Sequence, residues 1–178
     1  MATVSKTRDT VELLERWLIG GRARWVADLR EFFRGFRIRE TTFDLYVRGG
    51  TRNRGFLMSR FFAWSALPDY HVALLCISSE SVRSRMTSEK LRKAIDDALY
   101  HVGQEELKWA WLIAFLDSEV PAWGVSLVSR YDRQELGLSL ASTATGQVVV
   151  SANQIGRSIR KQLGLNKLME RIVHDKAN

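Results

Sequence analysis

Two uninterrupted apolar runs decide the fold of this chain: HVALLCIS at residues 71–78 and KWAWLIAFL at residues 108–116. Consecutive apolar positions of this length are typical of strands that are buried on both faces of a sheet. Between the two runs, apolar residues recur at helical spacing over residues 88–102. A strand, a helix and a second strand in this order predict a βαβ unit with two parallel strands at the centre of the sheet.

Ahead of this unit, the sequence predicts helical structure followed by strands. Apolar residues recur at helical spacing through residues 10–35, with Asp9 as a candidate N-cap and an interruption at Gly20-Gly21. We therefore expect one kinked helix or two short ones in this segment. Apolar and polar residues alternate over residues 42–48, which predicts a half-buried strand, and residues 56–64 predict a second strand.

The last third of the chain predicts an antiparallel extension of the sheet. Alternating patterns cover residues 123–131 and 136–141, and a turn leads into residues 147–150. Ser151 is placed to cap a final helix, which Gly164 is expected to end.

These patterns predict one domain over residues 1–178, with residues 1–8 flexible. The predicted fold class is mixed α/β (α+β): a single mixed sheet with a βαβ centre and an antiparallel extension, flanked by helices. No apolar run approaches the ~20 residues of a membrane-spanning helix, and residues 1–10 lack the apolar core of a signal peptide. Cys76 is the single cysteine, expected to be a buried thiol. Together these features predict a cytoplasmic protein without a membrane partner.

Positive charge is concentrated in two segments. Residues 22–60 contain ten arginines, no lysine and four acidic residues, and residues 149–178 contain six basic and two acidic residues. Residues 61–148 between them carry a small excess of acidic residues. Such focused charge is typical of a surface that binds a polyanion, and it is also compatible with general solubility. Arginine offers a planar fork of donors for phosphate that lysine lacks.

Two places in these segments are candidate phosphate contacts. The loop at residues 48–55 reads as a basic hairpin tip, and the start of the last predicted helix combines free backbone amides with cations. A solvated tip and a capped surface helix are the structural alternatives. The predicted nucleic-acid-binding residues are Arg48, Arg52, Arg54, Arg60, Ser151, Asn153, Arg157, Arg160 and Lys161.

The order of elements expected over residues 10–116 is helix, three strands, helix, strand. In this order the chain resembles the restriction-endonuclease-like superfamily, whose PD-(D/E)xK signature uses carboxylates to hold Mg²⁺ and a lysine to assist the attacking water. Asp44 stands where the first acid would be, and the matching triplet is Met58-Ser59-Arg60. Methionine is no ligand for a hard cation, so the resemblance implies a degenerate metal site. A second register, Asp69 with Glu80, lacks the lysine.

Other enzyme chemistries have little support in the sequence. The three histidines are scattered, without the spacing of a zinc site, and GxSxG and GxGxxG are absent. Trp123, which follows a proline by two positions, is a candidate exposed stacking platform, with a core position as its alternative. The sequence therefore favours a non-catalytic protein that grips DNA or RNA by its phosphates without a metal or other cofactor. The alternatives are an Mg²⁺-dependent nuclease using Asp44, and an interaction subunit that binds a protein partner or a second copy of itself.

Overall fold

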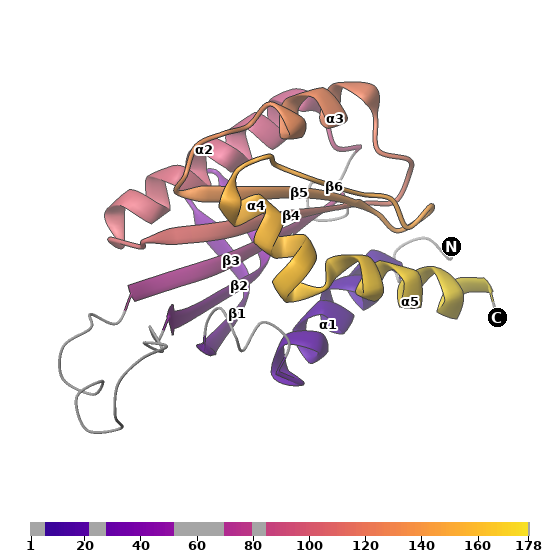
Figure 1. The fold of residues 1–178 in the computed structure, drawn as a ribbon, viewed down its shortest axis with the longest axis horizontal. Helices are drawn as coiled ribbons and strands as arrows, with labels where there is room; N and C mark the ends of the chain where they lie inside the picture. Colours follow the sequence, from indigo (N-terminus) through magenta and orange to yellow (C-terminus); the bar gives the residue numbers. More distant parts are fainter. Residues whose placement is uncertain (1–5, 22–27, 52–69, 80–84, 178) are drawn as a thin grey trace.

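The computed structural model describes residues 6–21, 28–51, 70–79 and 85–177, and Figure 1 shows their arrangement. Six strands form one sheet, and helices lie on both of its faces. The strands are β1 (Asp28–Ile38), β2 (Thr41–Thr51), β3 (Tyr70–Ser78), β4 (Trp109–Leu116), β5 (Leu136–Ser142) and β6 (Val148–Val150). The helices are α1 (Lys6–Ile19), α2 (Ser88–Gln104), α3 (Ala122–Ser129), α4 (Gln154–Ser158), the π-helix η1 (Ile159–Leu163) and α5 (Leu165–Ala177).

The predicted fold class is confirmed. The strands follow one another across the sheet in chain order, so β1 and β6 are its two edges. The pairs β1–β2, β2–β3 and β5–β6 are antiparallel, whereas β3–β4 and β4–β5 are parallel. The strand β5 was expected to extend the sheet in the antiparallel direction, and it is instead parallel to β4. Because α3 connects these two strands, the centre of the sheet contains two consecutive βαβ connections rather than one.

Two apolar clusters lie on opposite faces of the sheet. The first joins β3, β4 and β5 to α2 and α3, and Leu75, Leu112 and Leu138 are among its fully buried members. The second joins the opposite face of these strands to α1, η1 and α5 through residues such as Leu74 and Trp111. The continuous apolar strands β3 and β4 supply both clusters, because alternate residues point to alternate faces. Cys76 is buried in the second cluster, as expected, and burial raises the pKa of its thiol.

The N-terminal helical prediction is wrong in its second half. Helix α1 begins at Lys6, so Asp9 lies inside it, and the region from Asp28 forms strand β1 instead of a helix. The register of β1 shifts between Leu29 and Glu31, which places Leu29 and Phe32 against the same apolar cluster three residues apart. A β-bulge can therefore give the buried apolar residues of an edge strand the spacing that is typical of a helix. The strand predicted at residues 56–64 lies outside the described residues.

A strand was predicted over residues 123–131, but residues 123–129 lie in helix α3 and residues 130–131 follow its end. Gly124 and Val128, one helical turn apart, face the sheet, while Trp123, Val125 and Leu127 flank this contact and are half-buried. The flanking residues produce the alternation that suggested a strand. A Cβ atom on Gly124 would lie 2.7 Å from Leu140 Cδ1, so this glycine lets the helix approach β5 closely.

The helix predicted to end at Gly164 is present as α4 followed by η1, with one correction at its start, and α5 follows it. Asn153, rather than Ser151, is the N-cap of α4, and its Oδ1 accepts a hydrogen bond of 2.6 Å from the Gly156 amide. Gly164 ends η1 in the left-handed conformation with a φ of 69°. None of the helices in the described part of the chain is both long and apolar enough to span a bilayer.

Candidate functional site

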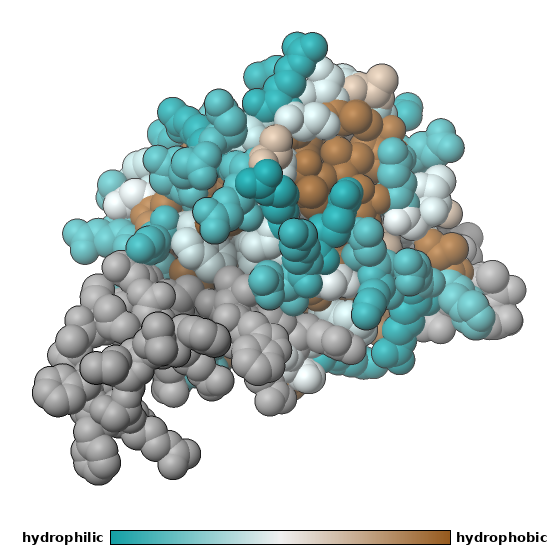
Figure 2. Space-filling model, viewed as in Figure 1, coloured by the Kyte–Doolittle hydropathy of each residue, from teal (hydrophilic) through white to brown (hydrophobic). Residues whose placement is uncertain are grey.

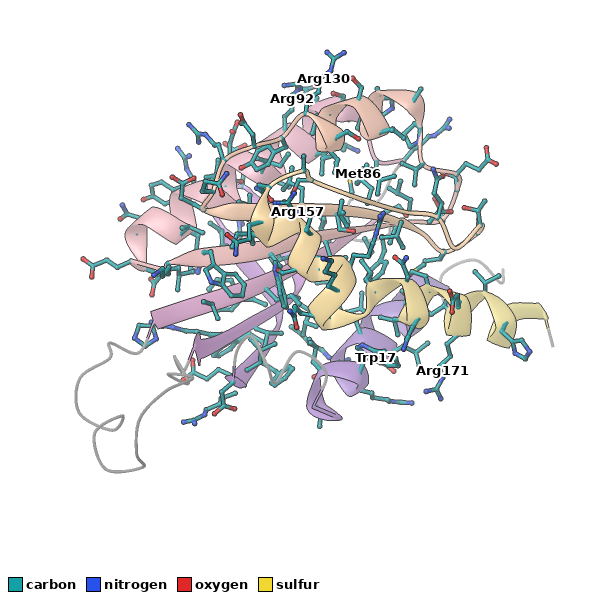
Figure 3. The ribbon with its side chains drawn as sticks, in the orientation of Figure 1. Trp17, Met86, Arg92, Arg130, Arg157 and Arg171 are labelled. Atoms are coloured by element: carbon teal, nitrogen blue, oxygen red, sulfur yellow. The ribbon has the colours of Figure 1, made fainter. Side chains whose placement is uncertain are left out.

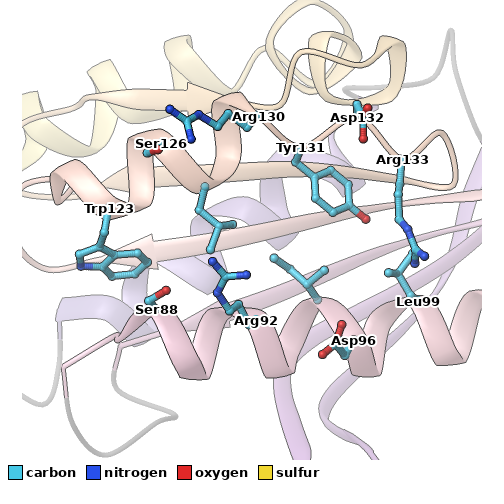
Figure 4. Close-up of a pocket in the computed structure, with 12 residues that line it drawn as sticks. Ser88, Arg92, Asp96, Leu99, Trp123, Ser126, Arg130, Tyr131, Asp132 and Arg133 are labelled. Atoms are coloured by element: carbon cyan, nitrogen blue, oxygen red, sulfur yellow. The ribbon is translucent and has the colours of Figure 1, made fainter.

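A groove of about 700 Å³ runs between α2 and the segment formed by α3 and the residues after it (Figure 4). Charged and aromatic side chains line this space, which we call the α2–α3 groove. Its charged and aromatic lining includes Arg92, Asp96, Trp123, Arg130, Tyr131 and Arg133. A groove of this size and mixed chemistry is typical of a ligand site.

The groove has two walls: helix α2 forms one, and helix α3 with the residues that follow it forms the other. Helix α2 presents Arg92 and Asp96 one turn apart on the side that faces α3. Helix α3 ends at Ser129, and residues 130–135 then cross to the start of β5. This short crossing places Arg130 and Arg133 along the upper wall of the groove, on either side of Tyr131.

Tyr131 is the most unusual residue of the groove. Its hydroxyl is buried and, within the described part of the chain, has no hydrogen-bond partner. Burial is the main reason that the pKa of this phenol is raised to about 12, so the hydroxyl keeps its proton at neutral pH. Native structures rarely leave a buried hydroxyl unsatisfied, so this atom is a candidate hydrogen-bond partner for a ligand.

The cations of the groove have no ion-pair partner within the part of the chain that the structure describes. Among the described residues, Arg92, Arg130 and Arg133 are all exposed and take part in no salt bridge. Asp96 and Asp132 also line the groove, so it presents hydrogen-bond donors and acceptors together.

The predicted cations of the N-terminal segment are arranged differently. Arg48 is half-buried and forms an ion pair of 3.5 Å with Glu105, while Arg52, Arg54 and Arg60 lie outside the described residues. Three further arginines of this segment are also ion-paired. Their pairs are Arg30 with Asp28, Arg34 with Glu12 and Glu15, and Arg39 with Asp97. Much of the positive charge described in this segment is therefore compensated within the protein.

Ser151 and Asn153 do not present their side chains as phosphate ligands. Both are buried: the Ser151 hydroxyl accepts a hydrogen bond from the Leu138 amide and donates one to Asn153 Oδ1. The Asn153 amide donates to the carbonyl oxygens of Arg133 and Leu136. The two residues therefore fix the start of α4 against β5, which is a structural role.

Arg157, Arg160 and Lys161 are exposed, as the predicted role requires. No ion pair involves these three among the described residues, although Arg160 Nη2 donates to the Val148 carbonyl oxygen at 2.9 Å. Arg37, Arg85 and Lys167 are likewise exposed and have no ion pair among the described residues. We give the name cationic face to the six cations of the groove and of the first part of the C-terminal helices. It consists of Arg92, Arg130, Arg133, Arg157, Arg160 and Lys161.

A hydrogen bond from the Asn153 side-chain amide to the Arg133 carbonyl oxygen links two of the segments that carry members of the cationic face. This bond joins the groove wall to the first turn of α4, which carries Arg157. Figure 3 shows Arg92 and Arg130 together above α2 and α3, and Arg157 below them beside α4. Figure 2 shows hydrophilic side chains across the middle of the same face, beside an apolar area between α3 and β6.

Asp44, the candidate metal ligand of the nuclease alternative, is half-buried on β2. One of its carboxylate oxygens accepts a hydrogen bond of 2.6 Å from the Ser78 amide. Met58, Arg60, Asp69 and Glu80, which completed the two PD-(D/E)xK registers, lie outside the described residues. Within the part of the chain that the structure describes, histidine, cysteine and acidic side chains form no group that could hold a metal ion.

A buried polar cluster on the far side of α2 was not predicted. His101 Nε2 lies 3.0 Å from the Tyr46 hydroxyl, and burial lowers the pKa of this histidine. Asp97 is buried and accepts hydrogen bonds from the Thr41 amide and hydroxyl. These contacts join α2 to strand β2.

Sequence reasoning missed the groove arginines because they lie in the segment with a slight acidic excess. The signal that could have found them is the sequence SRYDR at residues 129–133, which places an aromatic residue between two arginines. Comparison of the chain with protein-family models, with curated proteins and with solved structures finds no match.

Proposed function

We propose that this protein binds nucleic acid, and that the cationic face is where it contacts the phosphate backbone. The carrying observation is a difference in charge pairing between the two halves of the chain. Four of the five described arginines of residues 22–60 are paired with carboxylates, Arg37 being the exception, while the six cations of the cationic face have no such partner among the described residues. Exposed cations without a carboxylate partner are free to exchange counterions for phosphates.

The chemistry of the side chains supports a phosphate ligand. Five of the six cations are arginines, whose planar guanidinium can donate two parallel hydrogen bonds to one phosphate. Contacts of this kind provide affinity and a strong dependence on salt, with little reading of sequence. The proposal includes no cofactor and no catalytic step.

A protein-interaction role is the second candidate, and one observation favours it. Strand β1 is an edge of the sheet, and Phe33 on this strand is 44% exposed. An open edge with an exposed aromatic residue is a surface that another chain could pair with. A stable dimer, measured by analytical ultracentrifugation, would support this second candidate.

The test of the proposed function is a fluorescence anisotropy titration with labelled DNA and RNA, each as single strand and duplex. We expect the double variant Arg157→Ala/Arg160→Ala to bind all of them more weakly. The matched control is Arg34→Ala/Lys93→Ala, which removes the same charge from cations paired with Glu15 and Glu40. Equal binding by both double variants and the wild type would contradict the proposal.

Two further arms address the remaining sequence-based predictions. Arg52→Ala/Arg54→Ala tests the loop at residues 48–55, where we expect a weaker affinity if the loop also contacts phosphate. The same samples incubated with Mg²⁺ and analysed by gel test the nuclease alternative, for which cleavage abolished by Asp44→Ala would be the decisive result.

A further inference from the structure

We infer that the α2–α3 groove holds one unpaired base of a single-stranded nucleic acid, stacked on Trp123, while the groove arginines bind the flanking phosphates. This inference rests on the proposed function and adds a substrate class, because a base inside a duplex cannot enter a groove between two helices. It therefore predicts that the protein prefers single strands.

The groove combines the features that a nucleotide requires. Its volume of about 700 Å³ lies within the ~300–1,000 Å³ range of sites that enclose small organic ligands. Trp123 lies at one end of the groove beside Ser88, and Arg92 lies between this end and Tyr131 (Figure 4). An aromatic surface next to unpaired arginines is how sequence-tolerant single-strand binding sites are built.

Trp123 is suited to stacking because it packs against the apolar cluster and also lines the groove. Pro121 is the N-cap of α3, and Gly124 brings this helix into contact with β5. Trp123 packs in part against the apolar cluster beneath α3, and it is half-buried while also lining the groove. Its indole is therefore held in place before any ligand binds, which reduces the entropic cost of binding.

The Tyr131 hydroxyl and the two carboxylates supply partners for the edge of a base. The hydroxyl is buried with no partner among the described residues, so a polar ligand atom reaching the floor of the groove would satisfy it. Asp96 and Asp132 line the same groove, and carboxylates accept hydrogen bonds from the exocyclic amino groups of bases. We therefore expect cytosine and adenine, which carry such a group, to bind better than thymine.

The test compares a labelled oligo(dC) single strand with a duplex of the same length in anisotropy titrations at one salt concentration. We expect the wild type to bind the single strand about tenfold more tightly, since stacking one base contributes roughly that factor. Tyr131→Phe and Trp123→Leu should each reduce this preference while leaving duplex affinity unchanged. Phe33→Leu, which alters an exposed aromatic residue on β1, is the control and should keep the preference.

The outcomes separate this inference from the proposed function. If single strand and duplex bind equally well, and neither groove variant changes their ratio, the base site is excluded although phosphate binding stands. If no nucleic acid binds at all, the proposed function itself fails. Unlabelled AMP serves as a competitor, and displacement of the strand by AMP at a lower concentration than by unlabelled oligo(dA) would assign the groove to free nucleotides and overturn the single-strand assignment.

Discussion

The side-chain amide of Asn153 donates a hydrogen bond of 2.5 Å to the backbone carbonyl oxygen of Arg133. This single bond connects the loop that forms one wall of the α2–α3 groove to the N-cap of α4. Asn153 also donates to the Leu136 carbonyl and accepts from the Gly156 amide, so one buried residue satisfies three backbone groups. The relative position of the groove and of Arg157 therefore depends on Asn153.

Replacing Asn153 with alanine should destabilise the protein by about 1–3 kcal/mol, because the helix loses its cap and buried backbone groups are left unsatisfied. Urea denaturation followed by circular dichroism measures the change. Asn153→Asp is the informative companion, since it keeps the acceptor for Gly156 and removes the amide donors. An unchanged unfolding midpoint for Asn153→Ala would show that these bonds do not hold the loop in place.

Gly137→Ala should destabilise the protein by about 1–3 kcal/mol, because its new Cβ would lie 2.7 Å from the backbone of α4 at Gly156. The control is Gly103→Ala in α2, where no atom lies within 4 Å of the added Cβ. Because Gly103 lies in the last turn of α2, this control should leave stability unchanged or raise it slightly. Thermal denaturation of both variants checks the prediction, and a loss of stability in both would indicate that glycine is not required specifically where β5 meets α4.

Tyr131→Phe should leave stability at neutral pH unchanged or raise it, because the variant removes a buried hydroxyl without a partner among the described residues. At alkaline pH the wild type behaves differently from the variant. The folded-state pKa of about 12 lies above the ordinary value of 10.0, so the unfolded chain releases this proton first and stability falls between pH 10 and 12. Urea denaturation across this pH range should show a smaller fall in Tyr131→Phe.

His101 should make the protein less stable as the pH falls. Burial lowers the folded-state pKa of His101 below 6.5, so the unfolded chain binds this proton more readily and acidification below pH 6.5 favours unfolding. His101→Gln, which has no titrating group, should lose less stability than the wild type between neutral pH and pH 5. Equal losses in the two proteins would exclude His101 as a source of the acid sensitivity.

The elements that could be predicted from the sequence are the central strands of the sheet and the helix that connects them, because burial determines their pattern of apolar residues. The runs at residues 71–78 and 108–116, and the helix between them, have the expected bounds to within a few residues because burial on both faces dictates their composition. Strand β1 could not be predicted, since its register shift gives Leu29 and Phe32 a helical spacing. Helix α3 could not be predicted because only two of its eight residues are buried. The half-buried apolar residues beside them alternate with other residues along the chain, as in a strand.

The candidate site was harder to predict than the fold. Arg157, Arg160 and Lys161 were identified because they lie in a segment with a basic excess, and the structure places them at the surface. The groove arginines escaped notice because charge counted along the chain does not reveal which cations are paired in space. Arg48 was predicted to contact nucleic acid, but it forms an ion pair with Glu105, which is too distant in the sequence for the pairing to be recognised there.

The dependence of affinity on salt tests the central claim most directly. We compare Arg130→Ala/Arg133→Ala/Arg157→Ala, from the cationic face, with Arg30→Ala/Arg34→Ala/Lys93→Ala, whose cations are paired with Asp28, Glu15 and Glu40. Both triple variants remove the same net charge. The plot of log affinity against log salt should become shallower by about 2 to 3 in the first variant, at roughly 0.7–0.9 for each phosphate that the protein no longer neutralises, and stay unchanged in the second. Equal slopes for the two variants would contradict the claim that the unpaired cations bind the phosphates.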